Sequence, residues 1–235
     1  MSSGKLYIIP SVIAADQNDA IPEQARQVIK QTKHYLAEDL RTARRFISSL
    51  ELGLNIPDLH FDKLDKNTSY REMEKLMTPA KEGKTMGLMS ESGCPGVADP
   101  GSIAVQFAHA NDIDVIPVTG PSSILLLLMA SGFNGQQFAF HGYLPIDNKQ
   151  LINKIKSLEE ESRRKNQTQI FIETPYRNEK LLDILLKHAY PETHLCIGRD
   201  ITGKDELIKS APVKSWRSQN ISLHKIPTVF AIYSR

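Results

Sequence analysis

The sequence predicts an α/β protein of two domains, the first built on a parallel sheet wrapped by helices and the second on a mixed sheet. Short apolar strands alternate strictly with helical segments through the first half of the chain, which is typical of a parallel sheet. After about residue 120 the pattern changes, and residues 206–212 and 226–233 are expected to be strands without long helices between them, which indicates a mixed sheet. We therefore expect one α/β domain at residues 1–119 and a second at residues 120–235.

In the first domain, apolar runs predict the strands, and apolar residues at helical spacing predict the helices. One helix opens after Pro22 and carries Ala25 and Ile29 on one face. Two others are expected to end at Gly53 and Gly83. The expected strands are residues 5–9, 35–37, 58–64, 85–89 and 114–118, and the expected helices are residues 23–34, 41–52, 69–81 and 102–110.

The second domain begins with a very apolar helix that Ser122 or Ser123 can cap and that Gly132 ends. Its last long helix is expected to start at Thr174 and Pro175. The expected helices are residues 124–130, 148–160 and 176–189, and the expected strands are residues 137–141, 168–173, 193–199, 206–212 and 226–233.

The loop of residues 90–101 joins a buried strand to a helix and contains three glycines. Glycine lets backbone N–H groups approach a ligand closely, because no Cβ stands in the way. Asp99 is expected to be the N-cap of the helix that follows, with Pro100 as its first residue. A loop of this kind can also simply close a tight connection. Because a second such loop follows at residues 119–123, we expect a ligand site at these strand ends.

Composition excludes several classes of protein. The formal net charge is +2, so no polycationic surface by itself implies nucleic acid. Cys94 and Cys196 are too few and too far apart for a disulfide framework or a zinc site, so we expect no metal and a cytoplasmic protein. The apolar run at residues 124–130 is too short to span a bilayer, and we expect neither a membrane segment nor a secretion signal.

Six segments resemble motifs of the tetrapyrrole methylase family and, within it, of the bacterial 16S ribosomal RNA ribose 2′-O-methyltransferases. They occur in the family's order and span nearly the whole chain. The segments are residues 37–41 (AEDLR), the loop of residues 90–101, and residues 118–123 (VTGPSS), 140–145 (FHGYLP), 173–177 (ETPYR) and 198–202 (GRDIT).

The resemblance implies a two-domain enzyme, usually a homodimer, that binds S-adenosyl-L-methionine in the cleft between its domains. Ligands of open α/β sheets lie outside the carboxyl ends of the strands, which is where these loops are expected. The residues implied to contact the cofactor are Pro10, Ser90, Glu91, Ser92, Gly93, Gly96, Val97, Ser122, Ser123, Ile172, Glu173, Asp200, Ile226, Pro227 and Thr228.

In methyl transfer the sulfonium of the cofactor carries the reactivity. The protein therefore mainly has to hold a nucleophile in line with the methyl group and exclude water. A base could help to deprotonate a hydroxyl, and Glu38 and Asp39, at a strand end, are the candidates. Alternatively, these two carboxylates cap the next helix and pair with its arginines. Arg41, Arg44 and Arg45 share a face of that helix and are candidates for RNA binding.

The sequence departs from the ribosomal RNA branch in several places. That branch usually has P-T-P-I-G-N-L after its first strand, where this chain has PSVIAAD at residues 10–16. Glu91 stands where the branch has Asp, and Cys94 where it has Thr. The branch commonly carries a small extra C-terminal domain, whereas this sequence stops at Arg235 after its last expected strand.

We therefore expect a methyltransferase that acts on a ribose 2′-hydroxyl of ribosomal RNA, with the small ribosomal subunit as its partner. One alternative is the same chemistry on a small molecule such as a tetrapyrrole. Another is a cofactor-binding protein that has lost catalysis, which the altered first loop favours. A third is a thiol hydrolase that uses Cys94, in a Gly-rich loop before a helix.

Overall fold

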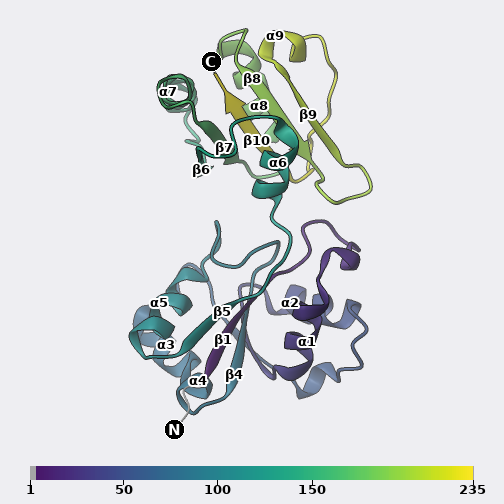
Figure 1. The fold of residues 1–235 in the computed structure, drawn as a ribbon, viewed down its shortest axis with the longest axis vertical. Coiled ribbons are helices and arrows are strands. Elements are labelled where there is room, and N and C mark those ends of the chain that lie inside the picture. Colours follow the sequence, from purple (N-terminus) through teal and green to yellow (C-terminus); the bar gives the residue numbers. More distant parts are fainter. Residues whose placement is uncertain (1–3, 235) are drawn as a thin grey trace. The chain divides into compact units, whose positions relative to one another are not determined.

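The computed structural model describes residues 4–234, and the chain divides between Ser122 and Ser123 into two compact units. Each unit is built on a five-stranded sheet with helices on both faces (Figure 1). The first sheet is entirely parallel and the second is mixed, which confirms the predicted fold class. Within residues 4–234, no helix is both long and apolar enough to cross a membrane.

The first unit has the strand order β3-β2-β4-β1-β5. Its strands are β1 (Lys5–Ile9), β2 (His34–Ala37), β3 (His60–Lys63), β4 (Thr85–Met89) and β5 (Asp114–Pro117). Helices α1 (Glu23–Gln31) and α2 (Leu40–Ser49) cover one face of the sheet, whereas α3 (Tyr70–Leu76), α4 (Thr78–Lys81) and α5 (Ser102–Ala110) cover the other (Figure 1).

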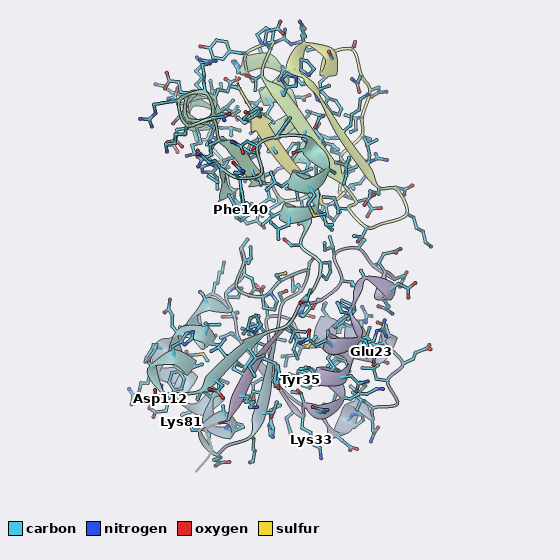
Figure 2. The ribbon with its side chains drawn as sticks, in the orientation of Figure 1. Glu23, Lys33, Tyr35, Lys81, Asp112 and Phe140 are labelled. Carbon is cyan, nitrogen blue, oxygen red and sulfur yellow. The ribbon has the colours of Figure 1, made fainter. Side chains whose placement is uncertain are left out.

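Tyr35 shows how closely the sheet and the first pair of helices pack. Its ring lies in the core between them (Figure 2), and its phenol donates to the carbonyls of Ile29 (2.9 Å) and Thr32 (3.0 Å). On the neighbouring strand, a Cβ at Gly87 would lie 2.7 Å from Ile9 Cδ1 and 2.9 Å from the ring of Tyr35. A glycine in the middle of β4 is therefore required by this large buried ring.

The second unit has the strand order β6-β7-β10-β8-β9. Its strands are β6 (Phe138–Tyr143), β7 (Thr168–Ile172), β8 (His194–Arg199), β9 (Leu207–Pro212) and β10 (Thr228–Tyr233). Strands β6 and β7 are parallel, and the other neighbours are antiparallel. Helix α6 (Ser123–Ser131) packs on one face, and α7 (Asn148–Lys165), α8 (Asn178–His188) and α9 (Val213–Trp216) pack on the other.

Several helices differ from the prediction. Helix α7 continues to Lys165 instead of ending near residue 160, because one residue of its last turns is part of the packed interior: Ser162 is buried, and its Oγ accepts from the backbone N–H of Ser234 at 2.8 Å. Helix α1 ends at Gln31, so His34 begins a strand and does not end a helix. Residues 69–81 form two helices, and the short helix α9 was not predicted.

The topology of the first sheet identifies where a ligand is expected. Strands β1 and β4 are neighbours, but the chain leaves β1 for α1 on one face and leaves β4 for α5 on the other. A reversal of this kind opens a crevice at the carboxyl ends of the two strands, which is where open α/β sheets bind ligands.

Candidate functional site

Three loops lie at the carboxyl ends of β1, β4 and β5, and hydrogen bonds join the first two. Ser11 donates through its backbone N–H to the carbonyl of Gly93 (2.9 Å) and through its hydroxyl to the carbonyl of Ser90 (2.8 Å). Gly93 donates back to the carbonyl of Val12. Ser11 and Ser90 are buried, so these bonds fix the loop after β1 against the loop after β4.

The third loop is held against the same two. A Cβ at Gly120 would lie 2.1 Å from Pro10 Cβ, so the ring of Pro10 occupies the space that a side chain would need. The thiol of Cys94 donates to the carbonyl of Pro121 at 3.4 Å. We call the three loops together, residues 10–13, 90–101 and 118–122, the cradle. Its members meet through small residues and backbone groups.

Asp99 has a different role from the one predicted. Helix α5 begins at Ser102, its N-cap is Gly101, and Asp99 is not the cap. The Oδ1 atom of Asp99 instead accepts from the backbone N–H groups of Gly96 (3.0 Å) and Gly101 (2.8 Å). The carboxylate thus closes the loop on itself and holds a backbone in which Gly93, Gly96 and Ala98 all have positive φ.

The open side of this loop carries most of the cofactor candidates of the first unit. Glu91, Ser92, Gly96 and Val97 are exposed, and nothing lies within 4 Å of the position of a Cβ at Gly96. Ser90 and Gly93 are buried beneath them, where the hydroxyl of Ser90 donates to the carbonyls of Ser92 and Gly93. Ser122, half-buried, ends the first unit, and Ser123 is the first residue of α6.

The structure separates the two carboxylate candidates for a base. Asp39 is the N-cap of α2: its Oδ1 accepts from the backbone N–H of Thr42 at 2.6 Å, and these hydrogen bonds lower the pKa of Asp39. Glu38 is half-buried directly after β2. Burial raises the pKa of Glu38, and the nearby carboxylates of Glu91 and Asp99 raise it further. The more basic carboxylate is therefore that of Glu38.

The environment of Cys94 argues against a thiol nucleophile. Burial raises the pKa of the Cys94 thiol, whereas a reactive cysteine needs a lowered one. Its hydrogen bond to Pro121 fastens the cradle. The hypothesis of a thiol hydrolase therefore has no support in this geometry.

The three arginines of α2 are exposed, as their spacing predicts. The guanidinium of Arg44 lies 4.9 Å from the centre of the Phe61 ring on β3, which limits the positions that Arg44 can take. Arg41 and Arg45 have exposed side chains on the same helix. Together, the three arginines form a basic surface on the helix that follows Glu38 in the sequence.

In the second unit, Glu173 follows the last residue of β7, Ile172, and is buried. It accepts from the backbone N–H of Thr174 at 2.7 Å and forms an ion pair with Arg177. The pair is local, four residues apart, and it fixes the turn that leads into α8.

The remaining candidates lie at the same edge of the second sheet. Strand β10 is antiparallel to β7 and β8, so its start lies beside their ends, where Thr228 pairs with Arg199. The N–H of Asp200 donates to the carbonyl of Pro227 (2.9 Å), and the Asp200 carboxylate accepts from Asp205 N–H (2.9 Å). Pro227 and Ile226 precede β10 and are not part of it.

Sequence reasoning missed the residues that fasten these turns. Ser11 and Asn178 are buried, and Asn178 Nδ2 donates to the carbonyl of Ile226 at 2.7 Å. Both are common polar residues outside the recognised motifs, and only their tertiary partners show their role. In the part of the chain that the structure describes, no group of three or more His, Cys, Asp or Glu side chains could hold a metal ion.

Comparisons with known proteins agree with this architecture. The model of the family described as Tetrapyrrole (Corrin/Porphyrin) Methylases matches residues 12–216. The ribosomal RNA small subunit methyltransferase I of Leptospira biflexa is 32% identical over 202 residues, which are 85% of this chain and 78% of the relative. The protein of the same name from Buchnera aphidicola subsp. Acyrthosiphon pisum is 29% identical over 232 residues, 97% of this chain and 78% of the relative.

Solved structures share the fold at low sequence identity. The crystal structure of diphthine synthase superposes with a TM-score of 0.70 at 12% identity, over 99% of this chain and 90% of that one. The methyltransferase CobJ gives a TM-score of 0.65 at 16% identity, over 99% and 95% of the two chains. The protein is thus an α/β enzyme of the methyltransferase class. It belongs to the tetrapyrrole methylase family.

Proposed function

We propose that this chain transfers a methyl group from S-adenosyl-L-methionine to a ribose 2′-hydroxyl of small-subunit ribosomal RNA. The observation that carries the proposal is the cradle, a set of three interlocked loops at the carboxyl ends of β1, β4 and β5. Relatives that align with most of this chain are named ribosomal RNA small subunit methyltransferase I, which supports RNA over a tetrapyrrole as the methyl acceptor.

The residues of the cradle fit such a cofactor. Its sulfonium is cationic and supplies the reactive methyl group, and at this edge of the sheet the carboxylates of Glu91 and Asp99 lie close enough to Glu38 to raise its pKa, so negative charge gathers there. Gly96 leaves open space beside its backbone, where a ligand can approach closely. We propose that the exposed loop residues Glu91, Ser92, Gly96 and Val97 contact the cofactor over the buried support of Pro10, Ser90 and Gly93.

The same resemblance assigns Ser122, Ser123, Ile172, Glu173, Asp200, Ile226, Pro227 and Thr228 to cofactor binding. The structure gives Glu173 and Asp200 internal partners, which supports a role in shaping their turns. The hydroxyl of Thr228 donates to the carbonyl of Ile226, so these two residues likewise form one local unit.

Glu38 is the group that we propose as general base. A base must lie at the site and be deprotonated, and it works best when its pKa is close to the working pH. Glu38 follows the carboxyl end of β2, beside β4, and its pKa is raised. Its carboxylate would accept the proton of the ribose hydroxyl as the oxygen attacks the methyl group. Asp39 is committed to the cap of α2.

RNA would be attracted by the basic surface of Arg41, Arg44 and Arg45, because phosphate contacts contribute much of the affinity for RNA. We further propose a cytoplasmic homodimer whose functional domains are residues 1–119 and 120–235. The family resemblance supports the dimer.

The decisive experiment is methyl transfer. Purified protein, tritiated S-adenosyl-L-methionine and small ribosomal subunits that lack the modification should give labelled RNA with the label on a ribose. Free RNA is expected to be a poorer acceptor than the assembled subunit, because the protein is close to neutral overall. No label on subunits, with cofactor binding intact, would exclude the RNA substrate and leave a small-molecule acceptor or an inactive binding protein.

A further inference from the structure

Tyr176 is an unusually exposed aromatic side chain next to a proposed functional turn. It lies three residues after Glu173, and 75% of its surface is exposed. The ammonium of Lys225 lies 5.7 Å from the centre of its ring. Tyr176 is not packed in the hydrophobic core, and a cation lies close to its ring. In both respects it resembles the aromatic side chains on which proteins stack nucleobases.

The partner of Tyr176 is held in place by the backbone. Lys225 has a positive φ of 59°, rare for a residue with a long side chain, and its N–H donates to the carbonyl of Pro175 at 3.1 Å. The next residue, Ile226, accepts from buried Asn178 at the start of α8. These two hydrogen bonds fasten the segment before β10 onto the turn that carries Tyr176, so the backbone positions of Lys225 and Tyr176 are set before any ligand arrives.

Other exposed side chains lie at the same edge of the second sheet. Tyr143, 58% exposed, pairs with Ile172 across the β6–β7 ladder, where an irregular register and a positive φ at Gly142 mark a bulge. Ile146, Arg177 and Lys180 line one shallow hollow beside Glu173. We call this group the tyrosine surface: Tyr143, Ile146, Tyr176, Arg177, Lys180 and Lys225.

We propose that the tyrosine surface binds unpaired nucleotides of the RNA substrate, with one base stacked on the ring of Tyr176. Lys225 and Lys180 would contact the flanking phosphates, since both ammonium groups are exposed. Arg177 is already neutralised by Glu173 and positions the turn. This inference rests on the proposed function, because it names the part of the substrate that the second unit recognises.

Single-stranded RNA suits this surface better than a second protein does. The exposed ring of Tyr176 has a lysine beside it, and exposed rings combined with cations are typical of sequence-tolerant base stacking, whereas the core of a stable protein interface is depleted of charged residues. Duplex RNA keeps its bases stacked inside the helix and leaves a tyrosine nothing to stack on.

The test measures binding of a labelled single-stranded RNA of about 12 nucleotides by fluorescence anisotropy, a length within the range of known single-strand sites. Tyr176→Ala should weaken binding about 10-fold, as expected for the loss of one stacked base, whereas Tyr176→Phe keeps the ring and the affinity. Lys225→Gln should lower the slope of log affinity against log salt by about 0.7.

Tyr190 provides a matched control. It is also an exposed tyrosine with a cation near its ring, Arg163 at 5.5 Å, but it lies beyond the opposite end of α8. Tyr190→Ala should leave RNA binding unchanged. All variants should bind S-adenosylhomocysteine as the parent does, and on ribosomal subunits Tyr176→Ala should raise KM with kcat unchanged.

Each contrary outcome has a distinct meaning. The proposal is overturned if the parent does not bind the single strand, if Tyr190→Ala weakens binding as much as Tyr176→Ala, or if Tyr176→Ala changes only the cofactor affinity or the oligomeric mass. A parent that binds the single strand through Tyr176 but does not methylate subunits would refute the proposed function alone. A parent that methylates subunits while Tyr176→Ala behaves normally would refute the tyrosine surface alone.

Discussion

The two units present opposite kinds of surface at the strand ends that carry the site candidates. In the first unit, the cradle is held by backbone hydrogen bonds and by close contacts of small residues such as Ser11, Gly93 and Gly120. In the second, charged and amide side chains hold the turns in addition to backbone hydrogen bonds, as in the pair of Glu173 and Arg177, and large side chains remain exposed.

The difference suits the two units to different ligands, the first to the cofactor and the second to the substrate. A backbone cradle cannot be altered at one position without moving its neighbours, which suits a ligand that never changes, such as a cofactor. Side chains on a fastened turn can be exchanged singly, which suits a substrate that differs between members of a family. We therefore expect larger effects from substitutions that strain the backbone of the cradle than from substitutions of exposed side chains or conservative exchanges that keep a hydrogen bond.

The largest effect is expected for Glu38→Gln. Loss of the base should lower kcat about 100-fold or more, because general base catalysis typically contributes at least that much. Since a base acts only when deprotonated, the parent should lose activity as the pH falls through the raised pKa of Glu38. The residual activity of the variant should not show this decrease at low pH. Measuring kcat of the parent and the variant between about pH 5 and 9 would test this difference.

Asp39→Asn is the matched control, because asparagine caps a helix as well as aspartate does. It should keep the rate and the pH profile of the parent. If Asp39→Asn loses activity and Glu38→Gln does not, the assignment of the base is wrong.

The second largest effect is expected for Gly96→Val. Gly96 has a φ of 80°, which a β-branched residue rarely adopts, and the new side chain would project from the cofactor face of the cradle. If the loop shifts to relieve a strain of about 1–3 kcal/mol, cofactor binding should weaken roughly 5- to 150-fold in calorimetry. Gly135→Val serves as control, since Gly135 has open space and no positive φ. Equal cofactor affinity in both variants would show that the cradle does not bind the cofactor.

A smaller effect, on RNA binding, is expected for the basic surface of the first unit, and a matched change in the second unit serves as comparison. Replacing Arg41, Arg44 and Arg45 by glutamine should reduce the salt slope of RNA binding by about one for each arginine that contacts a phosphate, without changing cofactor affinity. The matched triple variant changes Arg163, Arg164 and Lys165 at the end of α7. If only the second triple weakens binding, the RNA does not use the surface of α2.

The smallest effect is expected for Cys94→Ser. The hydroxyl can donate to the Pro121 carbonyl as the thiol does, so cofactor affinity and methyl transfer should remain within a few fold of the parent. A variant that binds cofactor normally but has no activity would support the hypothesis that Cys94 acts as a nucleophile.

The sequence determined the class of fold and the loop at which a ligand is expected. The strict alternation of apolar strands and helices predicts the parallel sheet, and the Gly-rich loop after β4 lies at the edge where a ligand is expected. These signals are local: hydrophobic periodicity and turn residues act on neighbours in the chain, so they can be recognised without knowing what lies opposite.

Tertiary structure decided the roles of individual residues, because each role depends on contacts and burial that sequence patterns do not reveal. Asp99 looked like a helix cap, yet its carboxylate closes the loop onto Gly96. Glu38 and Asp39 are equivalent in the sequence, and it is burial in the folded protein, together with the nearby carboxylates of Glu91 and Asp99, that raises the pKa of Glu38. Lys225 and Tyr176 are 49 positions apart, and only the fastening of the segment before β10 to the start of α8 brings a cation to that exposed ring.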